Sequence, residues 1–258
     1  MENTKLCVVF VVDIAYYSKF IDTCTQLRTV GKYKGDICLI IGDDLNNQEF
    51  LQSSFVKQYN ITVKYYPNLQ FSQEFIENQK TLDREYKWFQ KLFQYHKLNL
   101  FKTYFKKWDY IFYLDCGLTI YSDISPMISL AKKDTLLAHS DDYPKYERKL
   151  WYQFDKNKKE YEKLINTYKM DIDYPQTTIM LFDTSIIEDD TFDNLFRLTN
   201  EYPISITNDQ GIIALYYTCI KPVFKPISLH NENTFFYDYF LREYGNPYIM
   251  VKDTVFGH

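Results

Sequence analysis

The chain has 258 residues, of which 46% are apolar and 25% are charged, and its net charge at pH 7 is −4. This length suits one large α/β domain or two small ones, and the composition is ordinary for a globular protein. The acidic balance argues against nucleic-acid binding through a broad basic surface.

The five cysteines form no CxxC pair, and no Cys/His spacing resembles a zinc site. We interpret them as reduced, mostly buried thiols of a cytoplasmic protein. The apolar run "LCVVFVV" at residues 6–12 is too short to span a membrane, and it lacks the flanks of a signal peptide. We therefore expect no membrane span and predict a first β-strand there.

The first half of the chain alternates predicted strands and helices. After the strand at 6–12 we expect a helix over 17–30, a buried strand in "GDICLIIGDD" (35–44), a helix over 47–58 and a strand in "ITVKYY" (61–66). This order favours a doubly wound, mostly parallel central sheet flanked by helices.

The segment 82–108 contains no Gly or Pro and has a helical period, so it predicts one long helix or two helices broken near His96. It leads directly into the strand "YIFYLDCG", which stops on Asp115. Later strands are predicted in "DTLLAHSDD", "QTTIMLFDT", "KPVFKPISL" and "PYIMVKD". Helices are predicted in "IIEDDTFDNLFRLTNEY" and "TNDQGIIALYY", and the charged segment 145–170 is predicted to be a helical lid or acceptor-side element.

Acidic residues end several of the predicted strands: Asp13, Asp43, Asp44 and Asp115. In open α/β sheets ligands lie beyond the carboxyl ends of the strands, so these acids predict a polar site there. The alternative is that each acid caps the element that follows it. The phosphate-binding motifs GxGxxG and GxxxxGK[ST] are absent, as are the hydrolase motifs GxSxG and HExxH.

Four segments in the same order resemble the GT-A-fold glycosyltransferases of family 8, which include glycogenin and the lipopolysaccharide galactosyltransferases. They are "VVFVVDIAYY", "HKLNLFKTYFKKWDYIFYLDCGLTIYSDISPM", "YPQTTIMLFDT" and "NDQGIIAL". The resemblance implies a GT-A (Rossmann-like) nucleotide-diphospho-sugar transferase fold in a single domain, 1–258. Residues 1–123 would form the nucleotide-sugar-binding half and residues 124–258 the acceptor-side half.

The resemblance also implies roles for individual residues. Asp13 and Tyr17 would lie where the nucleotide base and ribose bind, and Lys97 near the donor sugar. Asp115 would be the first acid of the DxD motif. Asp209 and Gln210 would lie on the acceptor and sugar side, and they are candidate catalytic residues together with Asp141 and Asp142.

The sequence departs from the family pattern at the third DxD position, which is Gly117 and has no ligand atom. Cys116 is a poor substitute, because thiolates suit softer metals than Mn²⁺ or Mg²⁺. Two interpretations stay open. Asp115 holds Mn²⁺ or Mg²⁺ together with His230 or His258, or Lys97 and Lys252 neutralise the donor diphosphate without a metal.

The expected activity is therefore transfer of a sugar from a nucleotide-sugar, a UDP-sugar in the first instance, to a hydroxyl acceptor on a glycan, a protein or another molecule. Two alternatives come from other classes. One is a non-catalytic relative that binds a sugar or a partner, which the loss of the second DxD acid suggests. The other is a nucleotidyltransferase of similar fold, although "DIAYYSKF" lacks the glycine-rich phosphate loop that such an enzyme needs.

Overall fold

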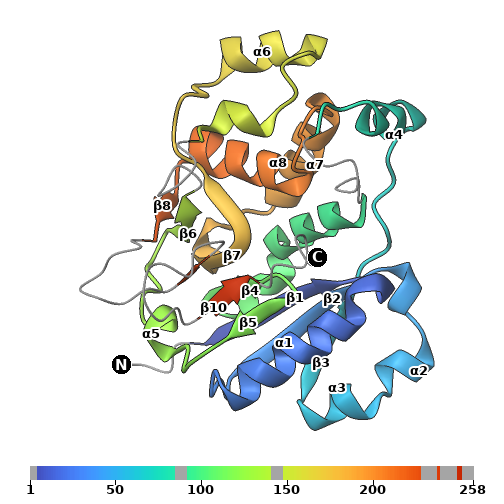
Figure 1. The fold of residues 1–258 in the computed structure, drawn as a ribbon, viewed down its shortest axis with the longest axis vertical. Coiled ribbons are helices and arrows are strands. Elements are labelled where there is room, and N and C mark those ends of the chain that lie inside the picture. The colour runs from blue at the N-terminus through green and yellow to red at the C-terminus, as the bar shows by residue number, and fades with distance from the viewer. Residues whose placement is uncertain (1–4, 85–91, 141–147, 228–236, 239–248, 252–258) are drawn as a thin grey trace, which may run out of the picture.

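A seven-stranded sheet forms the centre of the protein in a computed structural model that describes residues 5–84, 92–140, 148–227, 237–238 and 249–251 (Figure 1). The strand order is β3-β2-β1-β4-β7-β6-β8. These strands are β1 (Leu6–Val12), β2 (Asp36–Ile41), β3 (Ile61–Tyr65), β4 (Tyr110–Leu114), β6 (Leu136–Ser140), β7 (Pro175–Asp183) and β8 (Phe224–Pro226).

Only β7 runs against the others in this sheet. It pairs antiparallel with β4 on one side and with β6 on the other, whereas the remaining neighbours pair in parallel. The predicted mostly parallel sheet is therefore confirmed. A second sheet has the order β5-β10-β9, from β5 (Leu118–Ile120), β10 (Ile249–Val251) and β9 (Tyr237–Asp238).

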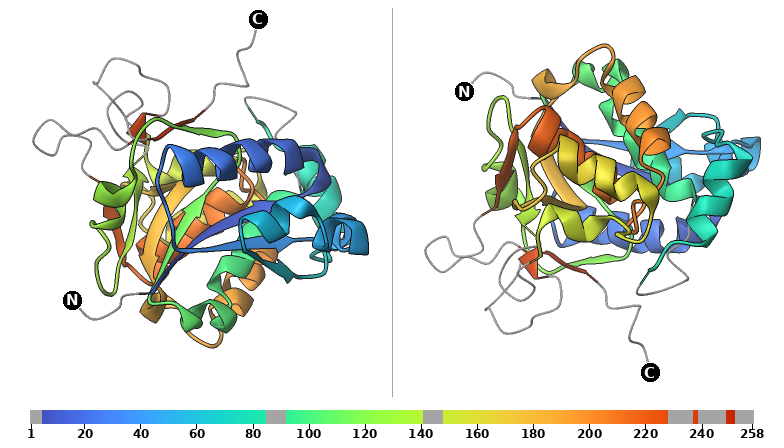
Figure 2. Two further views of the ribbon diagram at one scale, coloured as in Figure 1. Left: turned by 90° about the horizontal axis from the view of Figure 1, so that it is seen from below. Right: turned by 90° about the horizontal axis from the view of Figure 1, so that it is seen from above.

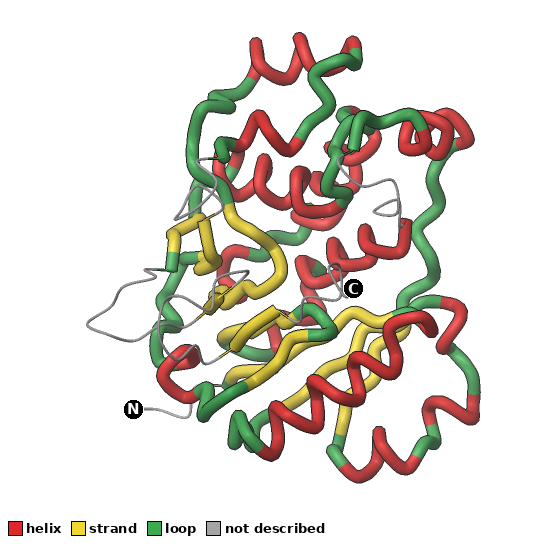
Figure 3. The backbone as a smooth tube through the Cα atoms, in the orientation of Figure 1, coloured by secondary structure: helices red, strands yellow, loops and turns green. Residues whose placement is uncertain are grey.

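Helices cover both faces of the central sheet (Figures 2 and 3). One face packs against α1 (Tyr17–Thr29), α2 (Gln48–Leu51) and α3 (Ser54–Gln58), and the other against the 3₁₀ helices η4 (Leu92–Phe101) and η5 (Thr103–Lys107) with α7 (Thr191–Glu201) and α8 (Asp209–Leu215). Alternate residues of β1 enter the two cores, Val8 and Phe10 on one side and Cys7 and Val9 on the other. Burial on both faces explains why this strand is a continuous apolar run.

Further described helices are α4 (Gln73–Lys80), α5 (Ser125–Ile128), η6 (Leu150–Gln153) and α6 (Lys159–Thr167). The remaining described ones are the 3₁₀ turns η1 (Ile14–Tyr16), η2 (Asp43–Leu45) and η7 (Thr184–Ile186) and the π-helix η8 (Tyr216–Ile220). Within the part of the chain that the structure describes, none of the helices combines the length and the apolar character needed to cross a membrane. All five cysteines are free, and Cys7, Cys24 and Cys38 are buried, as expected for reduced thiols.

The helix predicted over 82–108 differs from the structure. Its described residues are 82–84, which are not helical, and 92–108, which contain η4 and η5 separated by the extended residue Lys102. Every side chain from Tyr95 to Phe101 is buried, because η4 lies between the sheet and helices α7 and α8. An exposed stripe, which an amphipathic α-helix needs, is therefore missing from this stretch.

Two further helix predictions need correction. The helix predicted over 47–58 is two short helices, because Ser53 leaves the helical conformation and its side chain caps α3. The segment 145–170 contains only η6 and α6 among its described residues. Helix α4 was not predicted, since its sequence "QEFIENQK" is mostly polar, although Ser72 caps its start through Phe75 N.

Candidate functional site

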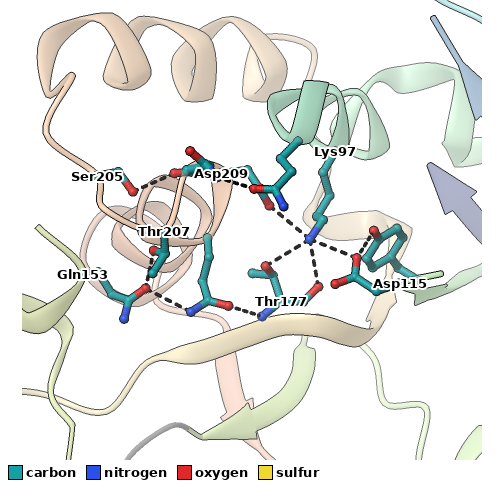
Figure 4. A network of polar contacts seen from close by, with 11 residues as sticks. Lys97, Asp115, Gln153, Thr177, Ser205, Thr207 and Asp209 are labelled. Carbon is teal, nitrogen blue, oxygen red and sulfur yellow. Dashed lines mark hydrogen bonds and ion pairs between the residues drawn. The ribbon is translucent and has the colours of Figure 1, made fainter. Parts of the chain in front are cut away.

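Lys97 joins four separate elements at the carboxyl edge of the parallel strands (Figure 4). Its Nζ lies 3.2 Å from Asp115 Oδ1 and 3.2 Å from Asp209 Oδ2. It also donates hydrogen bonds to the carbonyl oxygen and to Oγ1 of Thr177, both at 3.3 Å. Three residues that the sequence predicted for the site, Lys97, Asp115 and Asp209, therefore meet around one ammonium group.

The antiparallel direction of β7 brings these groups together. Because β7 runs against β4, its first residues lie beside the carboxyl end of β4, and the Asp115 amide donates to Thr178 O at 2.8 Å. Thr177 thus lies next to the point where β4 stops. Asp209 reaches the same place as the first residue of α8, which packs on β7 and η4.

The Lys97 side chain is only 9% exposed, and Asp209 is 3% exposed, whereas Asp115 is 35% exposed. Burial opposes the charge on Lys97, but Asp115 and Asp209 outweigh it, so the pKa of the ammonium lies above its ordinary value. Burial raises the pKa of the Asp209 carboxyl from its ordinary 3.8 to about 6, with Lys97 opposing the rise. When Asp209 is ionised, one cation faces two anions.

Tyr113 fixes the accessible carboxylate of the site. Its hydroxyl donates a hydrogen bond to Asp115 Oδ1, and Lys97 Nζ lies 5.0 Å from the centre of its ring. Burial, with the nearby Asp115 charge, raises the pKa of Tyr113 well above its usual range, so the hydroxyl keeps its proton. Tyr113 was not predicted, yet its position two residues before Asp115 in a strand places both side chains on one face.

Gln210 is held at both ends of its carboxamide. Its Oε1 accepts from Thr177 N at 3.1 Å, and its Nε2 donates to Gln153 Oε1 at 2.9 Å. Gln153 in turn donates to Tyr174 Oη at 2.7 Å. Gln153 is a buried member of η6 that sequence reasoning missed, since nothing in its charged surroundings distinguishes it from surface glutamines.

The acids at the ends of β1 and β2 behave differently from Asp115. Asp13 Oδ1 accepts from Tyr16 N at 3.0 Å, and Asp44 Oδ2 accepts from Ile14 N at 2.8 Å. Asp43 accepts from Tyr65 Oη at 2.6 Å and from Asn68 N at 3.2 Å. Only Asp13 caps the element that follows it, the turn η1 (Ile14–Tyr16), whereas Asp43 and Asp44 accept hydrogen bonds from other segments.

Tyr17, predicted for the nucleotide site, is half-buried in an aromatic cluster. Its ring packs edge-on against Phe50 at 5.2 Å and stacks on Phe20 at 6.4 Å. The remaining predicted residues, Asp141, Asp142, His230, Lys252 and His258, lie outside the described residues.

The described residues do not by themselves fit a divalent cation. Asp115 Oδ1 is already shared by Lys97 and Tyr113, and burial raises the pKa of the Cys116 thiol, which keeps it protonated. Gly117 has a φ of +94°, a conformation that disfavours an aspartate there. Among the described residues no group of three or more His, Cys, Asp or Glu side chains could hold a metal ion.

Comparisons with known structures identify the fold. The chain is similar to galactosyltransferase LgtC in complex with donor and acceptor sugar analogues (TM-score 0.59, 14% identity, 90% of this chain and 75% of that chain). It is also similar to mouse xyloside xylosyltransferase 1 (TM-score 0.52, 10% identity, 98% of each chain) and to core-mannan synthase A of Aspergillus fumigatus in its Mn/GDP form (TM-score 0.53, 12% identity, 88% of this chain and 73% of that chain).

No protein-family model matches the sequence, and no curated protein matches it significantly. The chain has the fold of the GT-A glycosyltransferases, as the sequence resemblance predicted. At these identities the comparisons establish the fold, and the activity is argued below from the site.

Proposed function

We propose that this protein is a glycosyltransferase that transfers a sugar from a UDP-sugar to a hydroxyl group of a glycan, a protein or another acceptor. The observation that carries the proposal is the Lys97 hub, which joins Asp115, Thr177 and Asp209 where ligands bind in open α/β sheets. Solved glycosyltransferases with the same fold support it.

In the proposed reaction the bond between the anomeric carbon and the diphosphate breaks, and a bond to the acceptor oxygen forms. Asp115 is the exposed member of the hub, so it is placed to accept hydrogen bonds from the donor sugar. Gln210 Oε1, fixed by Thr177 N, offers its second lone pair to the cationic sugar or to the acceptor hydroxyl. Asp209 is too deeply buried for either role, and it acts by holding Lys97.

The net charge of the hub limits how well Lys97 can stabilise the negative charge of the leaving diphosphate. Its ammonium faces two carboxylates, so above pH 6 or so the hub carries a net negative charge. The Lys97 hub is therefore not the source of the positive charge that opposes the diphosphate. Lys19 is a described lysine at this edge, since its Cδ lies 3.6 Å from the position of a β-carbon at Gly117. Lys252 is the lysine to which the resemblance gives this role. We derive no step through a metal ion.

The acceptor would bind on the side of η6, in the half of the chain proposed to face the acceptor. Gln153 of η6 contacts Gln210, and the neighbouring Trp151 and Tyr152 are 41% and 36% exposed. Large exposed aromatic rings that are sequence neighbours of Gln153 suit the flat apolar face of a sugar. Trp151→Ala is expected to raise the acceptor KM several-fold and to leave donor affinity unchanged.

The test is a panel of nucleotide-sugars, with and without divalent cations, in which release of the nucleoside diphosphate and transfer to added glycans are measured. We expect turnover with a UDP-sugar and loss of turnover in Lys97→Met. The exposed Lys57→Met on α3 is the matched control and should retain activity. Binding of a UDP-sugar without any turnover would favour the non-catalytic alternative. Release of inorganic diphosphate from a nucleoside triphosphate and a sugar phosphate would favour the nucleotidyltransferase.

A further inference from the structure

The residue before Asp209 has an unusual backbone conformation. Asn208 has φ +56° and ψ −121°, and it is only 2% exposed. A residue with a β-carbon pays a steric cost at positive φ, and Asn tolerates it better than most. Such conformations persist only when the surrounding contacts enforce them.

Three hydrogen bonds, two of them buried, hold the conformation of Asn208. Arg84 Nη1 donates to its side-chain oxygen at 2.8 Å, and its side-chain amide donates to Gln94. Ser205 Oγ donates to the Asn208 carbonyl oxygen at 2.6 Å. Gly211 makes room for this last bond, because a β-carbon at 211 would lie 2.4 Å from Ser205 Oγ.

Arg84 and Gln79 extend this support to the whole segment before α8. Arg84 Nη1 also donates to Ile206 O at 2.9 Å, and its Nη2 donates to Gln79 Oε1. Gln79 Nε2 donates to Pro203 O at 2.9 Å. Gln79 near the end of α4 and Arg84 in the loop after it thus hold the backbone of residues 203–208, although the two segments are far apart in the sequence.

We propose that Arg84 is a positioning residue, which holds Asn208 in its positive-φ turn and thereby aims Asp209 at Lys97 and Gln210 at Thr177. The turn reverses the chain between Ser205 and the first residue of α8, so its relaxation would move the two side chains that follow it. The expected effect on turnover rests on the proposed glycosyl transfer, whereas the expected effect on stability does not.

A comparison of Asn208→Gly with Asn208→Ala distinguishes the effect of the backbone conformation from the effect of losing the side-chain contacts. Both delete the side chain that Arg84 and Gln94 hold, but glycine adopts the turn without steric cost whereas alanine does not. We expect Asn208→Ala to lower kcat about tenfold with little change in the donor KM, and Asn208→Gly to recover most of that loss. Arg84→Gln should lower kcat in the wild-type background and have little further effect in Asn208→Gly.

A second measurement needs no substrate. The unfolding equilibrium constant of Asn208→Ala should exceed that of Asn208→Gly by roughly five- to tenfold in urea denaturation, because only alanine keeps the strain. Equal stability of the two variants would overturn the claim of an enforced turn, even if the protein transferred no sugar. Equal kcat in the two variants, or an unchanged kcat in Arg84→Gln, would overturn the positioning role while the proposed transfer stood.

Discussion

Lys97→Met should destabilise the protein by an amount that grows with pH. The variant keeps the apolar stem of Lys97 and removes the ammonium that opposes the raised pKa of Asp209. In the wild type the rise from 3.8 to about 6 corresponds to about 3 kcal/mol against the ionised carboxylate. Without the ammonium, the buried carboxyl titrates at a still higher pH.

The sign and size of the effect follow from proton linkage. A carboxyl with a raised folded-state pKa stabilises the fold fully below its unfolded pKa, and this contribution is lost as the pH rises through the folded pKa. In the wild type the loss is complete a little above pH 6, so stability is then flat. In Lys97→Met the folded state keeps its proton at higher pH, so the free energy of unfolding keeps falling by about 1.4 kcal/mol per pH unit.

The expected extra destabilisation is therefore below about 0.5 kcal/mol at pH 6 and reaches about 2.7 kcal/mol at pH 8, if the pKa of Asp209 rises beyond 8. Loss of the bonds to Thr177 adds about 1–3 kcal/mol that does not depend on pH.

Urea denaturation at several pH values, followed by tryptophan fluorescence, measures the difference. The double variant Lys97→Met/Asp209→Asn should lose the pH dependence, and Lys57→Met should match the wild type throughout. A difference between Lys97→Met and wild type that stays constant from pH 6 to pH 8 would refute the coupling of Lys97 to Asp209.

Three further outcomes are expected. In calorimetry, UDP or a UDP-sugar should bind, whereas ATP and NAD should not, because the chain lacks their phosphate-binding glycine motifs. Binding of ATP or NAD without binding of a uridine nucleotide would refute the proposed UDP-sugar donor. Mn²⁺ alone should leave the melting temperature unchanged, and EDTA should leave nucleotide binding and transfer unchanged, since Lys97 and Tyr113 already share Asp115 Oδ1. Positive coupling between Mn²⁺ and UDP that Asp115→Asn abolishes would contradict this expectation and assign a metal to Asp115. Gly117→Ala should cost about 1–2 kcal/mol in urea denaturation, because its φ is +94°, and an unchanged stability would show that the turn relaxes.

The strand-end acids show how far local patterns predict a site. The apolar runs correctly predicted where β1, β2 and β4 end, and the acids that follow these strands lie at their carboxyl ends. Their individual roles could not be predicted. Asp13 caps a short helical turn, whereas Asp115 pairs with Lys97, and an isolated strand-end acid has the same sequence pattern in both cases.

The segment around Lys97 shows where the sequence pattern failed to predict the secondary structure. Its apolar spacing predicted a long helix, but residues 95–101 are all buried between the sheet and two helices, and the backbone forms two shorter 3₁₀ segments. The resemblance placed Lys97 near the donor sugar, yet the low exposure of its side chain follows only from packing.

The sequence by itself determined the class of fold, because strand and helix periodicities depend on neighbours a few residues apart. Through a resemblance to known motifs it also predicted Lys97, Asp115, Asp209 and Gln210 as residues of one site, and these residues lie close together in the structure. Only the tertiary structure decided that one ammonium bridges two carboxylates, that Gln153 and Tyr113 fix their partners, and that Arg84 anchors the turn before α8. The partners in these contacts are mostly far apart along the chain, so the antiparallel pairing of β7 and the packing of α8 on η4 had to form before their chemistry could exist.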